Sequence, residues 1–217
     1  MNIGVLGTGM VGQAIAGKLI SLGHTVKIGS RSGSNEKANE WVSKSGANAS
    51  QGTFAETAAF GEIIFNCTKG EVSLEALKMA GAENLKGKVL IDISNPLDFS
   101  KGMPPTLLVC NDNSLGEQIQ QAFPETHVVK TLNTLTAPLM VNPQLVNNGD
   151  HDIFLSGNNK EAKEKVSALL QTFGWAAEHL RDLGDITTAR GTEQLLPLWV
   201  RLYGAMGSPM FQFKIVR

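Results

Sequence analysis

Six residues near the start of the chain, Gly7-Thr8-Gly9-Met10-Val11-Gly12, have the glycine spacing of a phosphate-binding loop. They directly follow the apolar run Asn2–Leu6 and open an amphipathic segment, which is the strand–turn–helix context that the motif requires. There Gly7 permits a tight turn, Gly9 lets the backbone approach a pyrophosphate, and Gly12 allows close helix–strand packing. The N–H groups that begin the helix can bind the phosphates. The motif therefore predicts a dinucleotide site; the alternative is a glycine-rich turn without a ligand.

The end of the second expected strand, Gly29-Ser30-Arg31-Ser32-Gly33, indicates which dinucleotide is bound. An NAD site usually ends this strand with a carboxylate that holds the ribose 2′-hydroxyl. Here no carboxylate occurs before Glu36. Arg31 can pair with a 2′-phosphate, and Ser30 and Ser32 can donate hydrogen bonds to it. The sequence therefore favours NADP(H) over NAD(H); the alternative is that Arg31 is an ordinary arginine in a polar turn.

Polar and turn-forming residues follow three later apolar runs: Thr68 and Lys69, Asn95 and Pro96, Asn133 and Thr134. The carboxyl ends of parallel strands meet at the edge of the sheet where ligands bind, so we expect these residues near the nicotinamide. Thr68, Asn95 and Asn133 are the candidates for positioning the ring. The two asparagines can bond the carboxamide or the acceptor, or only cap turns. Lys69 can stabilise negative charge on a reduced acceptor, or face solvent.

No group of side chains has a spacing typical of nucleophilic or acid–base catalysis, so no catalytic residue beyond the positioning candidates is predicted. Hydride transfer between two bound cofactors needs little more than their positioning. The four histidines show no ligand spacing, so no metal site is predicted. Cys67 and Cys110 lie in apolar runs, which indicates core thiols in a reducing compartment rather than a disulfide.

Two further groups of residues offer material for an acceptor pocket. Met103, Pro104 and Pro105 lie in the loop-like stretch Asn95–Thr106, where they either wall the pocket or only rigidify the loop. Aromatic residues gather late in the chain at Trp175, Trp199, Tyr203, Phe211 and Phe213. They could line a cleft or a dimer seam, although a C-terminal core is the simpler explanation.

The elements that must position these residues alternate between short apolar runs and segments of helical period, which is typical of a parallel sheet with crossover helices. Strands are expected at Asn2–Leu6, Thr25–Gly29, Ile63–Cys67, Lys88–Asp92, Val128–Leu132 and Asp152–Ser156, with a weaker one at Ala47–Ser50 and a closing one in Phe211–Val216. Helices are expected at Met10–Leu22, Asn35–Lys44, Val72–Ala80, Ser114–Ala122, Lys160–Phe173 and Asp185–Tyr203, the last kinked at Pro197. The predicted fold class is α/β, a Rossmann-type doubly wound parallel sheet. Residues 1–150 form the NADP-binding domain, and residues 151–217 form a small C-terminal α+β elaboration packed on the same sheet.

The bulk composition excludes several classes of partner. The chain has 217 residues, 42% of them hydrophobic, and a formal net charge of -1. This balance gives no electrostatic footprint for nucleic acid or an anionic membrane. The N-terminus shows no signal peptide and no run is long enough to span a bilayer, so we expect a cytoplasmic protein that acts on a small-molecule redox acceptor.

Taken together, the chain resembles the NADP oxidoreductases that depend on coenzyme F420, and the related reductase domain of the STEAP metalloreductases. The resemblance rests on the loop Gly7–Gly12, the turn Gly29–Arg31, Ser94-Asn95-Pro96-Leu97 and Val128–Thr134, and it extends to Gly184-Asp185-Ile186. It implies a homodimer and hydride exchange between NADPH and a flavin-like cofactor, either coenzyme F420 or FMN or FAD. It also implies that the serine and arginine of the second turn hold the 2′-phosphate.

Three functions remain to be distinguished. The leading hypothesis is an NADPH-dependent reductase of a deazaflavin or flavin. The second is an NADP-dependent imine or ketone reductase, although those enzymes usually carry a further helical domain for which little chain remains after Leu155. The third is a non-catalytic NADP(H) sensor, since a fold does not fix a function.

Overall fold

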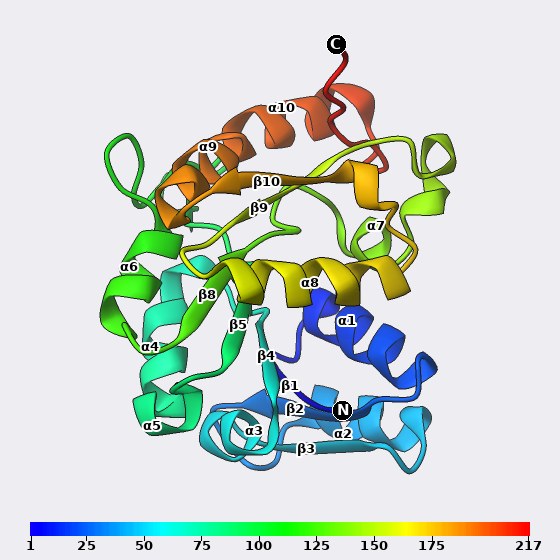
Figure 1. Ribbon diagram of the computed structural model, residues 1–217, viewed down its shortest axis with the longest axis vertical. Helices are drawn as coiled ribbons and strands as arrows, with labels where there is room; N and C mark the ends of the chain where they lie inside the picture. The colour runs from blue at the N-terminus through cyan, green and yellow to red at the C-terminus, as the bar shows by residue number, and fades with distance from the viewer.

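An eight-stranded sheet with the order β10-β9-β8-β5-β4-β1-β2-β3 forms the centre of the structure, a computed structural model that describes residues 1–217 (Figure 1). Its strands are β1 Asn2–Leu6, β2 Thr25–Ser30, β3 Ala49–Thr53, β4 Ile63–Asn66, β5 Val89–Asp92, β8 His127–Lys130, β9 Ile153–Ser156 and β10 Leu180–Gly184. The strands from β3 to β8 are all parallel and follow the order of the Rossmann fold. The predicted fold class is therefore confirmed.

Helices cover both faces of the sheet (Figure 1). They are α1 Met10–Ser21, α2 Glu36–Ser45, α3 Phe54–Phe60, α4 Gly70–Ala80, α5 Ala82–Leu85, α6 Leu115–Ala122, α7 Ala137–Val141, α8 Lys160–Thr172, α9 Ala189–Gln194 and α10 Leu196–Met206. One core lies beneath α1, α2, α7 and α8, and the other beneath α3, α4 and α6. In β1, Ile3 and Val5 enter the first core and Leu6 the second, which explains why the central strands are continuously apolar. None of the helices is long and apolar enough to cross a bilayer.

The C-terminal part of the sheet differs from the prediction. The last strand is β10, and Phe211–Val216 is not a strand: its backbone only meets the start of β9, where the Asp152 N–H donates to the Phe213 carbonyl over 2.9 Å. The polar edge strand Leu180–Gly184 carries no apolar run, so its sequence gives little signal. Strand β9 also runs antiparallel to β8 and pairs with it at one point, Lys130 with Ser156.

Several smaller elements also depart from the prediction. The expected helix Asp185–Tyr203 is divided at Leu195 into α9 and α10, because Pro197 starts a helix more readily than it kinks one. The loop-like stretch after Asn95 contains a hairpin of β6 Leu97–Asp98 and β7 Thr106–Leu107. Helix α3 was not expected, although Thr53 and Glu56 form a capping box at its start.

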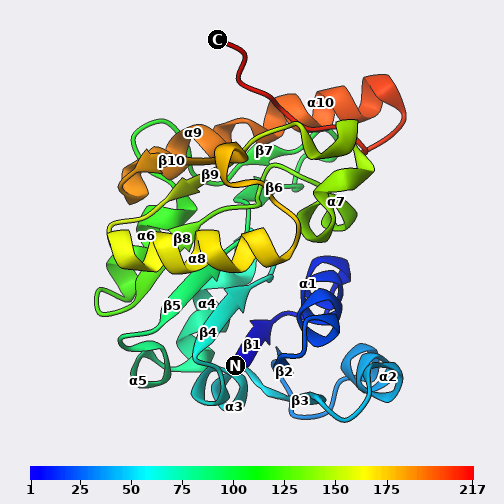
Figure 2. The ribbon, with the colours of Figure 1, turned by 45° about the vertical axis from the view of Figure 1, so that its right-hand side comes forward.

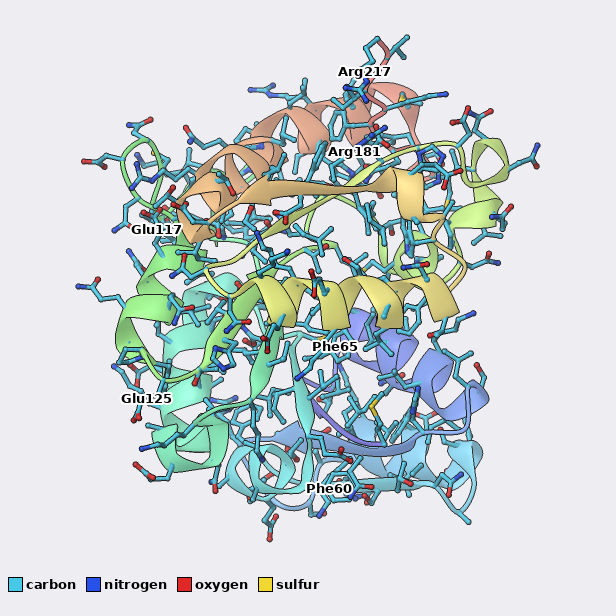
Figure 3. The ribbon with its side chains drawn as sticks, in the orientation of Figure 1. Phe60, Phe65, Glu117, Glu125, Arg181 and Arg217 are labelled. Atoms are coloured by element: carbon cyan, nitrogen blue, oxygen red, sulfur yellow. The ribbon has the colours of Figure 1, made fainter.

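The C-terminal segment is held to the sheet by the fully buried carboxylate of Asp152. Its Oδ1 accepts hydrogen bonds from Arg181 Nε and His179 Nδ1, both at 3.0 Å, and its Oδ2 accepts one from the Ile215 backbone N–H at 2.7 Å. Figure 3 shows Arg181, on β10, beneath the chain end at Arg217. Phe211 of the same segment stacks on Trp199 of α10, with ring centroids 5.3 Å apart. The segment therefore supports the helix that carries Trp199.

We predict that Asp152→Asn lowers the free energy of unfolding by about 1–3 kcal/mol near neutral pH, because three donors lose a charged acceptor. Burial alone would raise the pKa of Asp152, but the bonds from Ile215, His179 and Arg181 outweigh it and hold the pKa below its ordinary value. Since the folded-state pKa is depressed, this stabilisation is complete above the unfolded value of about 3.9 and is lost as the pH falls through the folded value. Urea unfolding from about pH 7 to about pH 3 should show a gap between wild type and variant that narrows on acidification.

Asp150→Asn is the matched control for this change. Asp150 also binds the C-terminal segment, through Lys214 at 2.5 Å, but both side chains are well exposed to solvent. Solvent screening makes such a pair contribute little, so this variant should stay close to wild type. A gap for Asp152→Asn that is constant with pH would contradict the role given to its charge.

Candidate functional site

A pocket of about 430 Å³ opens at the carboxyl ends of β1, β4, β5 and β8. It lies where the strand order reverses between β1 and β4, which is where doubly wound sheets bind ligands. Its polar wall contains Gly9, Thr68, Lys69, Ser94, Asn95 and Asn133, and its apolar wall contains Leu97, Phe99, Leu135, Met140, Leu196 and Trp199. The structure therefore brings the three positioning candidates, Thr68, Asn95 and Asn133, into one pocket.

The glycine loop fits the close approach of a pyrophosphate. Gly7 has φ of +115°, and an added Cβ there would lie 2.7 Å from the Cys67 carbonyl oxygen. At Gly12 a Cβ would overlap the Gly7 carbonyl oxygen, so both positions require glycine. A Cβ on Gly9, by contrast, meets nothing within 4 Å, and no side chain caps the start of α1 there. Open space thus lies beside free helix N–H groups, which is the arrangement that binds phosphate.

The turn after β2 lies directly beside this loop, because the Gly7 N–H donates to the Gly29 carbonyl over 2.9 Å. Arg31 and Ser32 are exposed, whereas Ser30 is buried and donates its hydroxyl to the Ser32 carbonyl over 2.6 Å. Arg31 and Ser32 are thus accessible to a ligand, and Ser30 shapes the turn that presents them. A 2′-phosphate fits this cationic, hydroxyl-rich turn, which lacks a carboxylate.

The two asparagines bind each other. Asn95 Nδ2 donates to the Asn133 carbonyl oxygen over 2.8 Å, and Asn133 Nδ2 donates to Asn95 Oδ1 over 2.9 Å. This pairing closes the polar wall between the ends of β5 and β8. Pro96, which follows Asn95, does not line the pocket; its carbonyl oxygen accepts from the Leu108 N–H over 2.8 Å. Lys69 borders the pocket with a side chain that is 84% exposed, and its Nζ lies 3.9 Å from the carboxylate of Glu71.

A buried ionic cluster lies behind this wall, and the sequence analysis missed it. Lys130 Nζ lies 2.7 Å from Asp92 Oδ2 and 2.8 Å from Glu193 Oε1, and all three side chains are buried. Asn66, Asp92 and Lys130 each end a neighbouring parallel strand at one level of the register. A polar residue at the end of each apolar run was the available signal for these three. Nothing local identifies Glu193, which comes from α9.

The environment of the cluster fixes the charges of two groups. Burial alone would lower the pKa of Lys130, but the carboxylates of Asp92 and Glu193 outweigh it and hold that pKa above its ordinary value. Burial, with a smaller contribution from Asp92, raises the pKa of the Cys67 thiol. Lys130 is therefore charged near neutral pH, and Cys67 lines the pocket as a neutral thiol. Cys67 and Cys110 are free and only partly buried, so neither is a full core residue as expected.

The apolar wall comes from segments far apart in the chain. Leu97 and Phe99 belong to the β6–β7 hairpin, which Figure 2 shows below α10, and Leu196 and Trp199 belong to α10 itself. Met103, Pro104 and Pro105 do not line the pocket. Among the late aromatic residues only Trp199 lines it; Trp175 is a core residue whose ring meets His151 edge-on. No cluster of side chains could hold a metal ion.

Comparison with known proteins identifies the family. The profile described as "NADP oxidoreductase coenzyme F420-dependent" matches residues 2–96. The F420-dependent NADP reductase of Methanocaldococcus jannaschii is 30% identical over 213 residues, which cover 93% of this chain and 92% of the relative. The chain belongs to the coenzyme F420-dependent NADP oxidoreductases. It is therefore an enzyme of an NADP-dependent oxidoreductase family.

Two further relatives support this membership. A crystal structure from Arthrobacter sp. FB24, named as a candidate F420-dependent NADP reductase, is 51% identical with a TM-score of 0.94 and covers 99% of both chains. Metalloreductase STEAP3 of Rattus norvegicus is 30% identical over 91% of this chain, but the chain spans only 38% of its length. The reductive aminase of Aspergillus terreus, at 18% identity and a TM-score of 0.66, shares the fold alone.

In this NADP oxidoreductase we predict that Gly70→Ala destabilises the protein by about 1–3 kcal/mol, because the new Cβ overlaps the Asn95 carbonyl oxygen across the polar wall. Gly17→Ala is the matched control, since a Cβ at Gly17 in α1 meets nothing within 4 Å. That change should stabilise the protein by about 0.5–1 kcal/mol through the helical preference of alanine. Thermal unfolding of both variants measures the difference. Equal effects would mean that the contact between Gly70 and Asn95 is loose.

Proposed function

We propose that this enzyme transfers a hydride between NADP(H) and a deazaflavin, coenzyme F420, or a flavin, FMN or FAD. The observation that carries the proposal is the contrast between the two walls of the pocket. The polar wall lies at the strand ends, where a nicotinamide is expected, and the apolar wall offers Phe99 and Trp199 to a second flat ring. Two rings that face each other between such walls can react without further protein chemistry.

The glycine loop Gly7–Gly12 is proposed to hold the pyrophosphate through Gly9, Met10 and Val11 at the start of α1, with Thr8 beside them. Arg31 and Ser32 bind the 2′-phosphate, and Ser30 supports the turn. Thr68, Lys69, Asn95 and Asn133 form the part of the wall that receives the nicotinamide carboxamide and the acceptor edge. Pro96, outside the lining, restricts the backbone of the loop that carries Asn95. Support comes from the open space at Gly9 and the exposure of Arg31.

The protein's own residues position the two rings and shield them from water. When bound, NADPH supplies the hydride, and the acceptor takes up that hydride and one proton from water. The paired amides of Asn95 and Asn133 hold each other, so that the hydrogen-bond donors and acceptors that the polar wall presents to the ligand are fixed in place. Leu97, Phe99 and Trp199 exclude water from one side. The protonated Cys67 thiol offers no nucleophile, so no covalent intermediate with the protein is proposed.

We also propose an oligomeric state and a cellular location for the enzyme. Apolar side chains on α10, namely Leu198, Tyr203 and Met206, are exposed, and only Leu196 of this helix is buried. A second copy of the chain that covers this face would bury them, so we propose a homodimer. The free thiols of Cys67 and Cys110 suit the reducing cytoplasm, where we propose that the enzyme acts.

The acceptor is tested by titrating the protein with NADPH and then following NADPH absorbance with coenzyme F420, FMN and FAD offered separately. Rapid oxidation by one of them is expected, because hydride transfer between two positioned rings needs no further group from the protein. A cyclic imine and a ketone serve as competing acceptors. Oxidation by these alone would replace the proposal with an imine or ketone reductase, and tight binding without any oxidation would replace it with an NADP(H) sensor.

The cofactor assignment is tested at Arg31. Arg31→Asp should weaken NADPH binding about tenfold or more, because a carboxylate replaces the cation beside the 2′-phosphate, while NADH binding changes little. Fluorescence titration with each nucleotide measures both effects. Lys37→Asp is the matched control, since it makes the same charge change on exposed α2. Equal losses for NADPH and NADH would remove Arg31 from the 2′-phosphate site.

A further inference from the structure

The ammonium group of Lys130 is the only cation in its buried cluster and is bonded on three sides. It lies 2.7 Å from Asp92 Oδ2, 2.8 Å from Glu193 Oε1 and 2.6 Å from the Ser94 carbonyl oxygen. The sequence analysis assigned no role to the side chains of Lys130, Asp92 or Glu193. A buried ion pair of this kind is weak evidence for stability, because apolar replacements often fold as well. The role of the cluster is therefore inferred from the residues that it connects and not from its contribution to stability.

On one side the cluster fixes the polar wall of the pocket. Asp92 Oδ1 accepts from Asn66 Nδ2 at 2.8 Å, which turns Asn66 Oδ1 toward the Thr68 hydroxyl at 2.7 Å. The same Asp92 oxygen accepts from the Ser94 hydroxyl at 2.7 Å, and Ser94 precedes Asn95. Asn95 in turn holds Asn133. All three positioning candidates thus depend on the carboxylate that Lys130 neutralises.

On the other side the cluster reaches the apolar wall. Glu193 accepts from the backbone N–H groups of Leu115 at 2.7 Å and Gly116 at 3.0 Å, at the start of α6. Glu193 lies in α9, and Leu196 and Trp199 follow within the next two turns of helix on α10. The pair Lys130–Glu193 therefore joins the polar wall to α9, which leads directly into α10 and its two residues of the apolar wall.

We propose that Lys130 is a positioning residue for the nicotinamide end of the pocket. Through Asp92 and Ser94 it sets the orientation of Thr68, Asn95 and Asn133, and through Glu193 it sets the distance between the two walls. The proposal rests on the proposed placement of NADP(H), with the nicotinamide on the polar wall. It assigns a role to a residue that touches neither the cofactor nor the acceptor.

A comparison of two ligands tests the proposal by binding, and a single-turnover rate adds a second readout. Adenosine 2′,5′-bisphosphate carries the adenine and the 2′-phosphate but no nicotinamide. Lys130→Met should weaken the binding of NADPH about fivefold or more, which corresponds to the loss of one or two hydrogen bonds. The affinity for the bisphosphate should stay within about twofold of the wild-type value. The single-turnover rate of NADPH oxidation should fall further, by about a hundredfold, because ring alignment governs hydride transfer.

Lys163→Met is the matched control. Lys163 is also nearly buried, and it binds a carboxylate and a backbone carbonyl, Asp182 at 2.7 Å and Gly184 at 2.8 Å, but it does not line the pocket. It should lower the melting temperature and leave both affinities and the single-turnover rate unchanged. If Lys130→Met does not fold, the uncharged triple variant Lys130→Met, Asp92→Asn, Glu193→Gln leaves no buried charge unpaired and applies the same comparison to the cluster as a whole.

The outcomes separate this proposal from the proposed function. Selective loss of NADPH affinity supports the positioning role even if the wild type oxidises NADPH with none of the acceptors, and in that case only the proposed function fails. An equal loss of affinity for both ligands, or no loss of affinity in a folded variant, overturns the positioning role even if wild-type hydride transfer is rapid. An effect of Lys163→Met as large as that of the Lys130 variant would also overturn it.

Discussion

The contact on which the rest of the site depends is the bond between Lys130 Nζ and Asp92 Oδ2. Parallel strands in register bring their last residues side by side, so β4, β5 and β8 deliver Asn66, Asp92 and Lys130 to one level. A carboxylate at that depth is unfavourable unless a cation and hydrogen-bond donors surround it. Lys130 supplies the cation, and Asn66 and Ser94 supply the donors. Because those donors continue directly into the loops of the pocket, the neutralised charge and the shape of the site cannot be separated.

Two parts of the fold could be predicted from local sequence because local physics decides them. Strand β1 was predicted with its observed bounds, since a strand buried on both faces must be apolar throughout. The glycine loop was recognised because steric limits at Gly7 and Gly12 leave no other residue possible. Strand β10 could not be found in this way: it lies at the edge of the sheet, and its residues are partly exposed. The alternation in Phe211–Val216 instead suggested a strand where only a tethered segment exists.

The site divides along the same line. Thr68, Asn95 and Asn133 were predicted to meet because each follows a parallel strand, and strand ends converge at one edge. The reciprocal bonds between Asn95 and Asn133 required atomic positions, and so did the close approach of Gly70 to Asn95. Glu193 is separated from Lys130 by 63 positions and by several elements, so no spacing rule could join them. Register alone would have suggested the pair of Asp92 and Lys130, had the order of the strands been used.

Sequence likeness to a family says more about the dinucleotide than about the acceptor. The proposed dinucleotide site is built by the short segments that follow β1 and β2, and the geometry of the first demands glycine at Gly7 and Gly12, so sequence likeness there is informative about NADP(H). The opposite wall is assembled from Leu97 and Phe99 of a hairpin and Leu196 and Trp199 of α10, which meet only in the folded chain. Apolar residues of similar size can replace one another on such a wall without loss of the fold. The matched profile ends at residue 96, before the first of these four residues. The acceptor must therefore be argued from the chemistry of that wall. In our proposal the pair Lys130–Glu193 attaches this wall to the polar wall, because Glu193 lies in α9, just before α10.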